Sequence, residues 1–186
     1  MNHLRLCSLI ILLILCSSYS CSSDKASKGQ PDFTGFTLRD MGGVDLMIPN
    51  DWIKRKSSDS ILVAYLSNCA ESKVFCENVA VRTAKLDKAS INLDALLREF
   101  IATMPTRIDS FSIKTVNDTV INNIHMKIVS YTGQKKNFPV GSYMALAAYD
   151  TTVMQIGFAS ENIEQKYFKT YLPIFKKMLQ SAKRSD

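Results

Sequence analysis

Residues 141–149 read GSYMALAAY, and both alternating sets of side chains in this segment are largely apolar. Strands with two apolar faces are covered on both sides, so the segment predicts a strand with a layer packed on each face. Similar strand-like runs occur at 111–116, 123–131 and 152–159. Short turn signals separate the four runs, at Asn122-Asn123, Lys135–Asn137 and Asp150-Thr151. Connections this short cannot be parallel crossovers, so the sequence predicts an antiparallel meander.

An amphipathic helix precedes the meander. Within residues 93–104, apolar side chains recur at steps of three and four, which predicts a helix with one apolar stripe. Asn92 is a suitable N-cap for this helix. We expect Phe100, which lies on the stripe, to be buried, and Asp94 to pair with Arg98 one turn further along.

The remaining segments supply further strands and a second helix. Strands are predicted at 33–40, 44–49, 61–66 and 78–86. Gly42-Gly43 joins the first two in a hairpin. Residues 161–184 predict a helix, which Pro173 should kink or divide near Tyr171. The predicted fold is α+β, with a single antiparallel sheet flanked by two main helices.

Several of these apolar and turn residues also match a known family. They are the turn MIPNDW (47–52), the strand NVAV (78–81), Leu93 and Phe100 of the first helix, Tyr143 and Ile156 of the late strands, and Phe168 and Phe175 of the last helix. With them, the chain resembles a bacterial lipoprotein member of the PsbP-like family. The resemblance implies a single PsbP-like domain over 33–184, an α/β sandwich that acts by binding proteins or by organising a site. The matching residues specify a fold and carry no chemistry, so no catalytic role is transferred.

The first 20 residues have the layout of a secretory signal peptide. A basic start, the aliphatic run Leu9–Leu15 and a small-residue exit follow one another. The run is too short to span a bilayer. Cys21 follows directly and resembles the acylated cysteine of bacterial lipoproteins, although the residues at 18 and 19 depart from the usual lipobox. Cys16 is the second candidate for acylation.

These features predict where the protein resides. Residues 21–32 would form the lipidated cysteine and a flexible polar tether, with an acyl chain such as palmitate in the membrane. By resemblance to Gram-negative lipoproteins, Ser22 in place of an aspartate after the cysteine favours the outer membrane. The sequence therefore predicts a cell-envelope protein whose first partner is the membrane.

The mature chain would keep two further cysteines, Cys69 and Cys76, because Cys7 and Cys16 leave with the signal peptide. An even pair at short spacing in an exported protein predicts a disulfide. A redox pair or a metal site is the alternative. Redox motifs favour the spacing CxxC, and a zinc site needs about four ligands.

The mature chain offers few residues for chemistry. His125 is its one histidine, since His3 lies in the signal peptide. The sequence has no phosphate-binding loop, no calcium loop and no HExxH motif. We therefore expect no catalytic residue, metal, cofactor or nucleotide. Loss of Arg5 with the signal lowers the net charge from +6 to +5. Export and the lack of aromatic-basic repeats argue against a nucleic-acid partner.

The candidate partner-binding residues are aromatic or basic and lie near predicted turns. They are Trp52, Lys54, Arg55, Lys56, Lys135 and Lys136. Tryptophan is enriched at binding hot spots, although a lone tryptophan after a turn more often packs in the core. The basic residues suit a protein partner or anionic lipid headgroups, and the alternative is a solvated face.

Three functions fit this sequence. The first is a lipid-anchored, non-catalytic binding module of the cell envelope with an unidentified protein partner. The second is a secreted inhibitor or immunity-type protein, and the third is an envelope hydrolase. The single histidine and the missing motifs argue against the hydrolase, so the sequence favours the binding module.

Overall fold

The structure, a computed structural model, describes residues 31–55, 63–69, 75–85, 91–149 and 151–185. The chain divides into two compact units, Met1–Pro31 and Asp32–Asp186, and apart from Pro31 the described residues all belong to the second unit. The predicted signal peptide, the acylated Cys21 and most of the predicted tether therefore lie outside the described residues.

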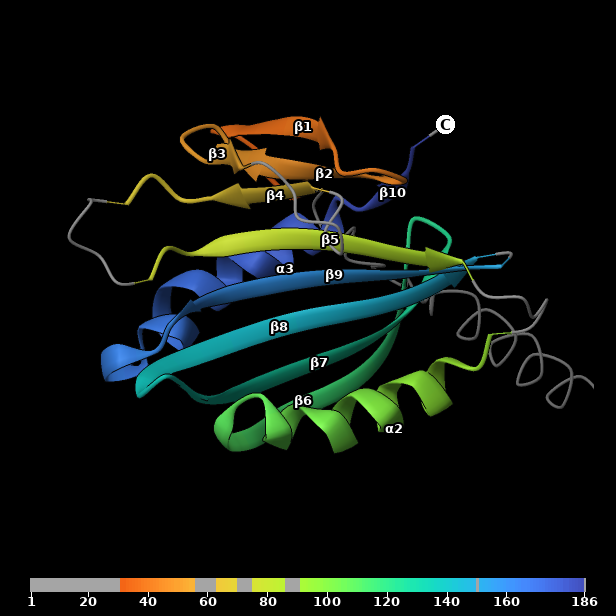
Figure 1. The fold of residues 1–186 in the computed structure, drawn as a ribbon. Helices are drawn as coiled ribbons and strands as arrows, with labels where there is room; N and C mark the ends of the chain where they lie inside the picture. Colours follow the sequence, from red (N-terminus) through yellow and green to blue (C-terminus); the bar gives the residue numbers. More distant parts are fainter. Residues whose placement is uncertain (1–30, 56–62, 70–74, 86–90, 150, 186) are drawn as a thin grey trace, which may run out of the picture. The chain divides into compact units, whose positions relative to one another are not determined.

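The larger of two sheets has seven antiparallel strands in the order β3-β4-β5-β9-β8-β7-β6 (Figure 1). Its strands are β3 (Ile53–Arg55), β4 (Val63–Leu66), β5 (Asn78–Lys85), β6 (Asp109–Ile121), β7 (Ile124–Lys135), β8 (Phe138–Tyr149) and β9 (Thr152–Glu161). The predicted meander β6 to β9 is confirmed. Its first two turns, Asn122-Asn123 and Lys136-Asn137, have φ between 47° and 64°, the left-handed values that tight hairpins require.

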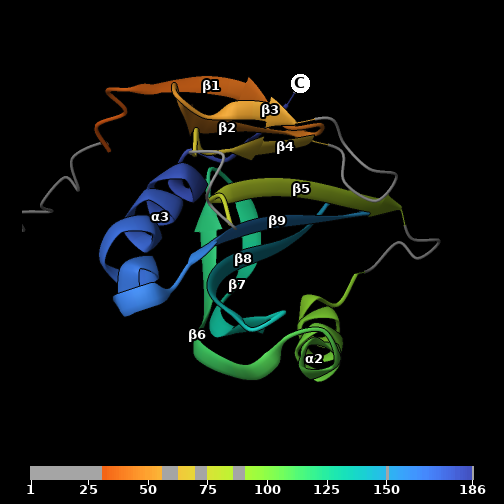
Figure 2. The same ribbon diagram turned by 60° about the vertical axis from the view of Figure 1, so that its left-hand side comes forward.

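Strand β8 is covered on both faces, as its sequence predicts. Tyr143, Ala145 and Ala147 belong to the main core cluster, whereas Met144 and Leu146 belong to a second cluster on the other face. Helix α3 (Leu172–Gln180) contributes to the main core, and helix α2 (Leu93–Thr103) contributes to the second. Figure 2 shows the two helices on opposite sides of the large sheet.

The prediction of a single sheet was wrong. Strands β1 (Phe36–Asp40), β2 (Val44–Pro49) and β10 (Lys183–Arg184) form a separate three-stranded sheet in the order β1-β2-β10. Because β10 pairs with the second edge of β2, that edge is not available to β3. The Trp52 N–H donates to the Pro49 carbonyl (3.1 Å), and after this turn the chain enters the larger sheet.

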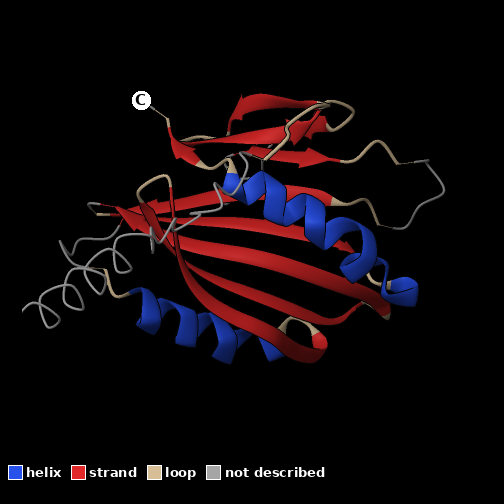
Figure 3. Ribbon diagram, turned by 180° about the vertical axis from the view of Figure 1, so that it is seen from behind, coloured by secondary structure: helices blue, strands red, loops and turns tan. Residues whose placement is uncertain are grey.

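The C-terminal element is divided more finely than one kinked helix. The short helical turns η2 (Ile163–Gln165) and η3 (Tyr167–Tyr171, π-helical) precede α3, and β10 follows it (Figure 3). The predicted break near Tyr171 is confirmed at the junction of η3 and α3. Pro173 sits in the first turn of α3, directly after the π-helical turn η3.

Helix α2 is capped as predicted but pairs differently. The Asn92 side chain accepts from the Ala95 N–H (3.0 Å). Phe100 is half-buried, because α2 lies along the sheet with Leu93 and Leu97 pointing inward. The expected Asp94–Arg98 pair is replaced by an ion pair between Asp94 and Lys127 of β7 (2.7 Å), which the helix spacing alone could not indicate.

Candidate functional site

The basic residues predicted to bind a partner do not form one surface. Lys54 and Arg55 are exposed on β3, at one edge of the large sheet, and Lys56 lies outside the described residues. Lys135 and Lys136 are exposed at the turn between β7 and β8. Five strand spacings separate β3 from β7, about 24 Å along the sheet. A single contact with a small partner group cannot include both segments.

Trp52 lies in the core, in line with the alternative interpretation of its sequence position. Its side chain is 8% exposed and meets the Phe175 ring edge-on, with 6.4 Å between ring centroids. One margin of Trp52 still lines a groove on the surface. The residue therefore supports a site from below.

This groove lies where the two sheets meet the C-terminal helical segment. It has a volume of about 510 Å³, within the range of small-ligand sites. Its walls come from the β2–β3 turn, the end of β4, the start of β5, η3 and α3: Phe36, Pro49, Asp51, Trp52, Ser67, Asn68, Glu77, Tyr171, Pro173, Ile174 and Lys177. Aromatic, proline and aliphatic side chains supply most of these walls. A few polar groups also face the groove.

The polar part of the groove is built around Glu77, which is only 1% exposed. The Ser67 hydroxyl donates to Glu77 Oε2 (2.7 Å), and the Ser67 N–H donates to the Glu77 carbonyl (2.8 Å). Burial and a hydrogen bond with the Glu77 carboxylate raise the pKa of Tyr171 to about 12. Tyr171 therefore keeps its proton at neutral pH, and its hydroxyl bonds to the buried Glu77 carboxylate within the groove.

Lys177 forms the rim of the groove on the α3 side. Its Nζ lies 4.4 Å from the centre of the Phe36 ring and 5.5 Å from that of Phe33. A cation over aromatic faces is attracted by the ring quadrupole. This contact ties α3 to the start of β1, so the rim is set by two segments far apart in the chain.

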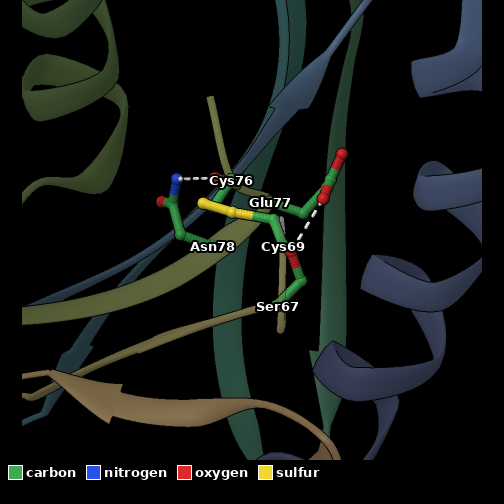
Figure 4. Close-up of a disulfide and its surroundings, with 5 residues drawn as sticks. All are labelled: Ser67, Cys69, Cys76, Glu77 and Asn78. Atoms are coloured by element: carbon green, nitrogen blue, oxygen red, sulfur yellow. Dashed lines mark hydrogen bonds between the residues drawn. A yellow bond between two sulfur atoms is a disulfide. The ribbon is translucent and has the colours of Figure 1, made fainter. Parts of the chain in front are cut away.

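A disulfide lies next to Glu77 (Figure 4). Cys69 and Cys76 are bonded, with Cα atoms 5.8 Å apart, as the sequence predicts. The Asn78 side-chain amide donates to the Cys76 carbonyl (3.0 Å), and Phe75 stacks on Phe138 at the start of β8. The disulfide thus holds the segment that places Glu77 at the start of β5.

We expect loss of this disulfide to destabilise the domain by about 2.5 kcal/mol, because the unfolded chain would no longer be closed into a short loop. The double variant Cys69→Ala/Cys76→Ala should show this loss in urea unfolding. Alkylation of the native protein without reductant should modify neither thiol. Two reactive thiols in protein taken from the envelope would contradict the pairing.

The structure places His125 away from this groove. Its side chain is 59% exposed on β7, with Nε2 3.9 Å from Oδ1 of Asp118. Within the part of the chain that the structure describes, no group of three or more His, Cys, Asp or Glu side chains could hold a metal ion. In that same part, no helix is long and apolar enough to cross a membrane.

Sequence reasoning missed Glu77 and Tyr171 as site residues. A signal for Glu77 was present, because it lies two and four positions before Val79 and Val81, which are buried on one face of β5. That alternation places the carboxylate on the core side of the strand. Tyr171 carries no such signal, since its contact with Glu77 joins segments nearly a hundred residues apart.

The arrangement of the two sheets and two helices recurs in solved structures. Cyanobacterial PsbP from Synechocystis sp. PCC 6803 superposes with a TM-score of 0.63, at 10% identity over 86% of this chain and 98% of that one. The chain has a PsbP-like fold. No protein-family model and no curated protein sequence matches the chain.

Two further solved structures resemble the chain in fold. LpqN of Mycobacterium tuberculosis, involved in cell envelope biogenesis, superposes with a TM-score of 0.62, at 11% identity over 81% of this chain and 91% of that one. PA94 of Pseudomonas aeruginosa, a putative regulator of unknown function, superposes with a TM-score of 0.54, at 12% identity over 78% of this chain and 94% of that one. At these identities the comparisons show the fold, and the groove residues must be interpreted from their own chemistry.

Proposed function

We propose that this protein is a lipid-anchored, non-catalytic binding module of the cell envelope, and that it binds its protein partner through the groove beside Glu77. The groove is the observation that carries the proposal. It combines an aromatic wall, Trp52 and Tyr171, with a buried carboxylate that accepts hydrogen bonds. A small number of fixed polar groups in a largely apolar groove gives a binding site its specificity.

The envelope part of the proposal has separate support. The N-terminal 20 residues have the layout of a secretory signal, and the disulfide suits an oxidising compartment. LpqN, which shares the fold, is involved in cell envelope biogenesis. Anchoring to the outer membrane of a Gram-negative bacterium through an acyl chain on Cys21 belongs to the same proposal.

Photo-crosslinking in cells tests the groove. We expect a benzophenone side chain in place of Asn68, which is exposed on the groove wall, to give one specific protein adduct. Asn117 is an equally exposed asparagine on the edge strand β6, and the same replacement there should give no such adduct. Equal adducts from both positions would contradict the groove as the binding site.

Removing one hydroxyl tests the polar part of the groove. Tyr171→Phe keeps the ring but removes the hydroxyl that bonds to the Glu77 carboxylate inside the groove. The buried carboxylate then loses a donor, so we expect urea unfolding to show a loss of about 1 to 3 kcal/mol and the adduct from position 68, measured on folded protein, to fall. Turnover of an envelope substrate that Glu77→Gln abolishes would instead show an enzyme and overturn the non-catalytic proposal.

Fatty-acid labelling tests the anchor. We expect labelled palmitate to enter the wild-type protein and the Cys16→Ser variant but not Cys21→Ala, because Cys21 alone joins the apolar run to a polar segment. Label that persists in Cys21→Ala and disappears in Cys16→Ser would move the anchor to the earlier cysteine.

A further inference from the structure

Positive charge is concentrated on one side of the large sheet. The segment from Glu164 to Gln180, which includes η3 and α3, contains four lysines and one glutamate. The lysines are Lys166, Lys169, Lys176 and Lys177. Helix α2, on the opposite side of the sheet, contains two acidic residues and one arginine. The segment 164–180 therefore carries a formal charge of +3, and helix α2 carries −1.

Aromatic rings accompany two of these lysines. Lys177 lies over Phe36 and Phe33, and Lys166 lies 5.5 Å from the centre of the Tyr171 ring. Glu161 is an acidic neighbour of Lys166, with 3.9 Å between the charged atoms, and Asp32 is an acidic neighbour of Lys177, while Lys169 and Lys176 are exposed to solvent. Lysines next to phenylalanine and tyrosine rings are typical of protein surfaces that lie at a membrane interface.

The point where the chain enters the domain lies on the same side. Phe33 is the second residue of the compact unit, and Lys177 of α3 contacts its ring. Only ten peptide steps separate Cys21 from Pro31, which span at most about 35 Å. An acyl chain on Cys21 would therefore keep the α3 side, where this segment ends, within that distance of the bilayer.

We propose that a surface formed by Lys166, Lys169, Lys176, Lys177, Phe33 and Phe36 docks on anionic lipid headgroups of the membrane that holds the acyl chain. The proposal rests on the acylation of Cys21 and adds an orientation to it. Negative lipid charge complements the four lysines, and the aromatic rings suit the headgroup layer. Because Lys177 also lines the groove, docking places the groove at the membrane surface, where a membrane-associated partner can reach it.

The experiment uses the full-length acylated protein reconstituted in vesicles. A fluorophore is attached through Gln180→Cys on α3 or through Arg98→Cys on α2, both exposed positions on helices that lie on opposite sides of the sheet. Gln180 lies one turn after Lys176 and is not one of the docking residues. A quencher is placed on the lipid headgroups. In vesicles of phosphatidylglycerol and phosphatidylethanolamine, we expect strong quenching at position 180 and little at position 98. Quenching at position 180 should decline in about 1 M salt, where the Debye length is about 3 Å, and in vesicles of phosphatidylcholine alone.

A variant that lacks two of the lysines tests whether the quenching depends on these charges. A basic residue near an anionic membrane contributes about fivefold to binding, so Lys166→Gln/Lys169→Gln should lower the docking equilibrium about 25-fold while the protein still floats with the vesicles. Equal quenching at positions 180 and 98, or quenching that does not depend on lipid charge, overturns the docking and leaves the anchor standing. Failure to float, together with absence of fatty-acid label, overturns the anchor and the docking with it.

Discussion

The Phe175→Ala variant is expected to lose about 4 kcal/mol of unfolding free energy, since truncating a core phenylalanine leaves a large cavity. Phe175 is fully buried on α3. Its ring stacks on Phe158 of β9 at 5.2 Å and meets Trp52 at 6.4 Å. It also lies 6.2 Å from the Tyr171 ring on the groove wall. The Phe175 ring thus joins α3 to the large sheet and to the turn between β2 and β3, which contains Trp52.

A matched control comes from the other helix. Phe100 of α2 is half-buried and lies 5.8 Å from the Tyr131 ring. We expect Phe100→Ala to cost about 1 kcal/mol, because only part of the side chain leaves water on folding. Urea unfolding of both variants measures the difference. If both variants lose the same unfolding free energy, the packing of α3 contributes no more to stability than that of α2.

Much of this fold could be predicted, because its long elements carry their own periodicity. The two-faced apolar pattern of residues 141–149 correctly indicated a strand covered on both sides. Asn122-Asn123 marked a tight hairpin, since asparagine tolerates positive φ better than most residues. Asn92 marked the start of α2 through its capping side chain.

The second sheet could not be predicted, because the residues that create it are few and distant. Strand β10 has two residues, Lys183 and Arg184, and shows no pattern of its own. It pairs with Asp45 and Val44 nearly 140 residues earlier. Strand β6 also exceeds its predicted length, since its polar stretch at 117–119 lies on an exposed edge where alternation is not enforced.

The site was predicted less well than the fold. Basic residues near turns suggested a surface, but the strand order places the two basic segments at distant strands. The groove instead joins Glu77 to Tyr171 and Lys177, and such contacts depend on how α3 crosses the sheet. Local sequence rules describe elements, whereas this site arises where three elements meet.

Gly141→Ala is expected to cost about 3 kcal/mol or more, the upper range for overpacking a core. The Tyr167 ring lies directly on the Gly141 backbone, and a Cβ at this position would overlap the ring. The ring cannot easily shift, because its hydroxyl donates to the Ser142 carbonyl (2.6 Å) and is bonded to the Ser130 hydroxyl (2.8 Å). Moving Tyr167 would leave buried polar atoms without partners, which adds to the loss.

The neighbouring strand supplies the control for this substitution. A Cβ at Gly157 of β9 would meet only the Ala80 carbonyl oxygen at 3.9 Å, an ordinary contact, so Gly157→Ala should change stability by less than about 1 kcal/mol. A double-mutant cycle isolates the cause. In a Tyr167→Ala background the ring is gone and only the contact with the Cβ of residue 167, at 2.6 Å, remains, so Gly141→Ala should cost clearly less. If its cost is the same in both backgrounds, Tyr167 is not what requires glycine at position 141, and the packing of η3 on β8 is looser than the structure shows.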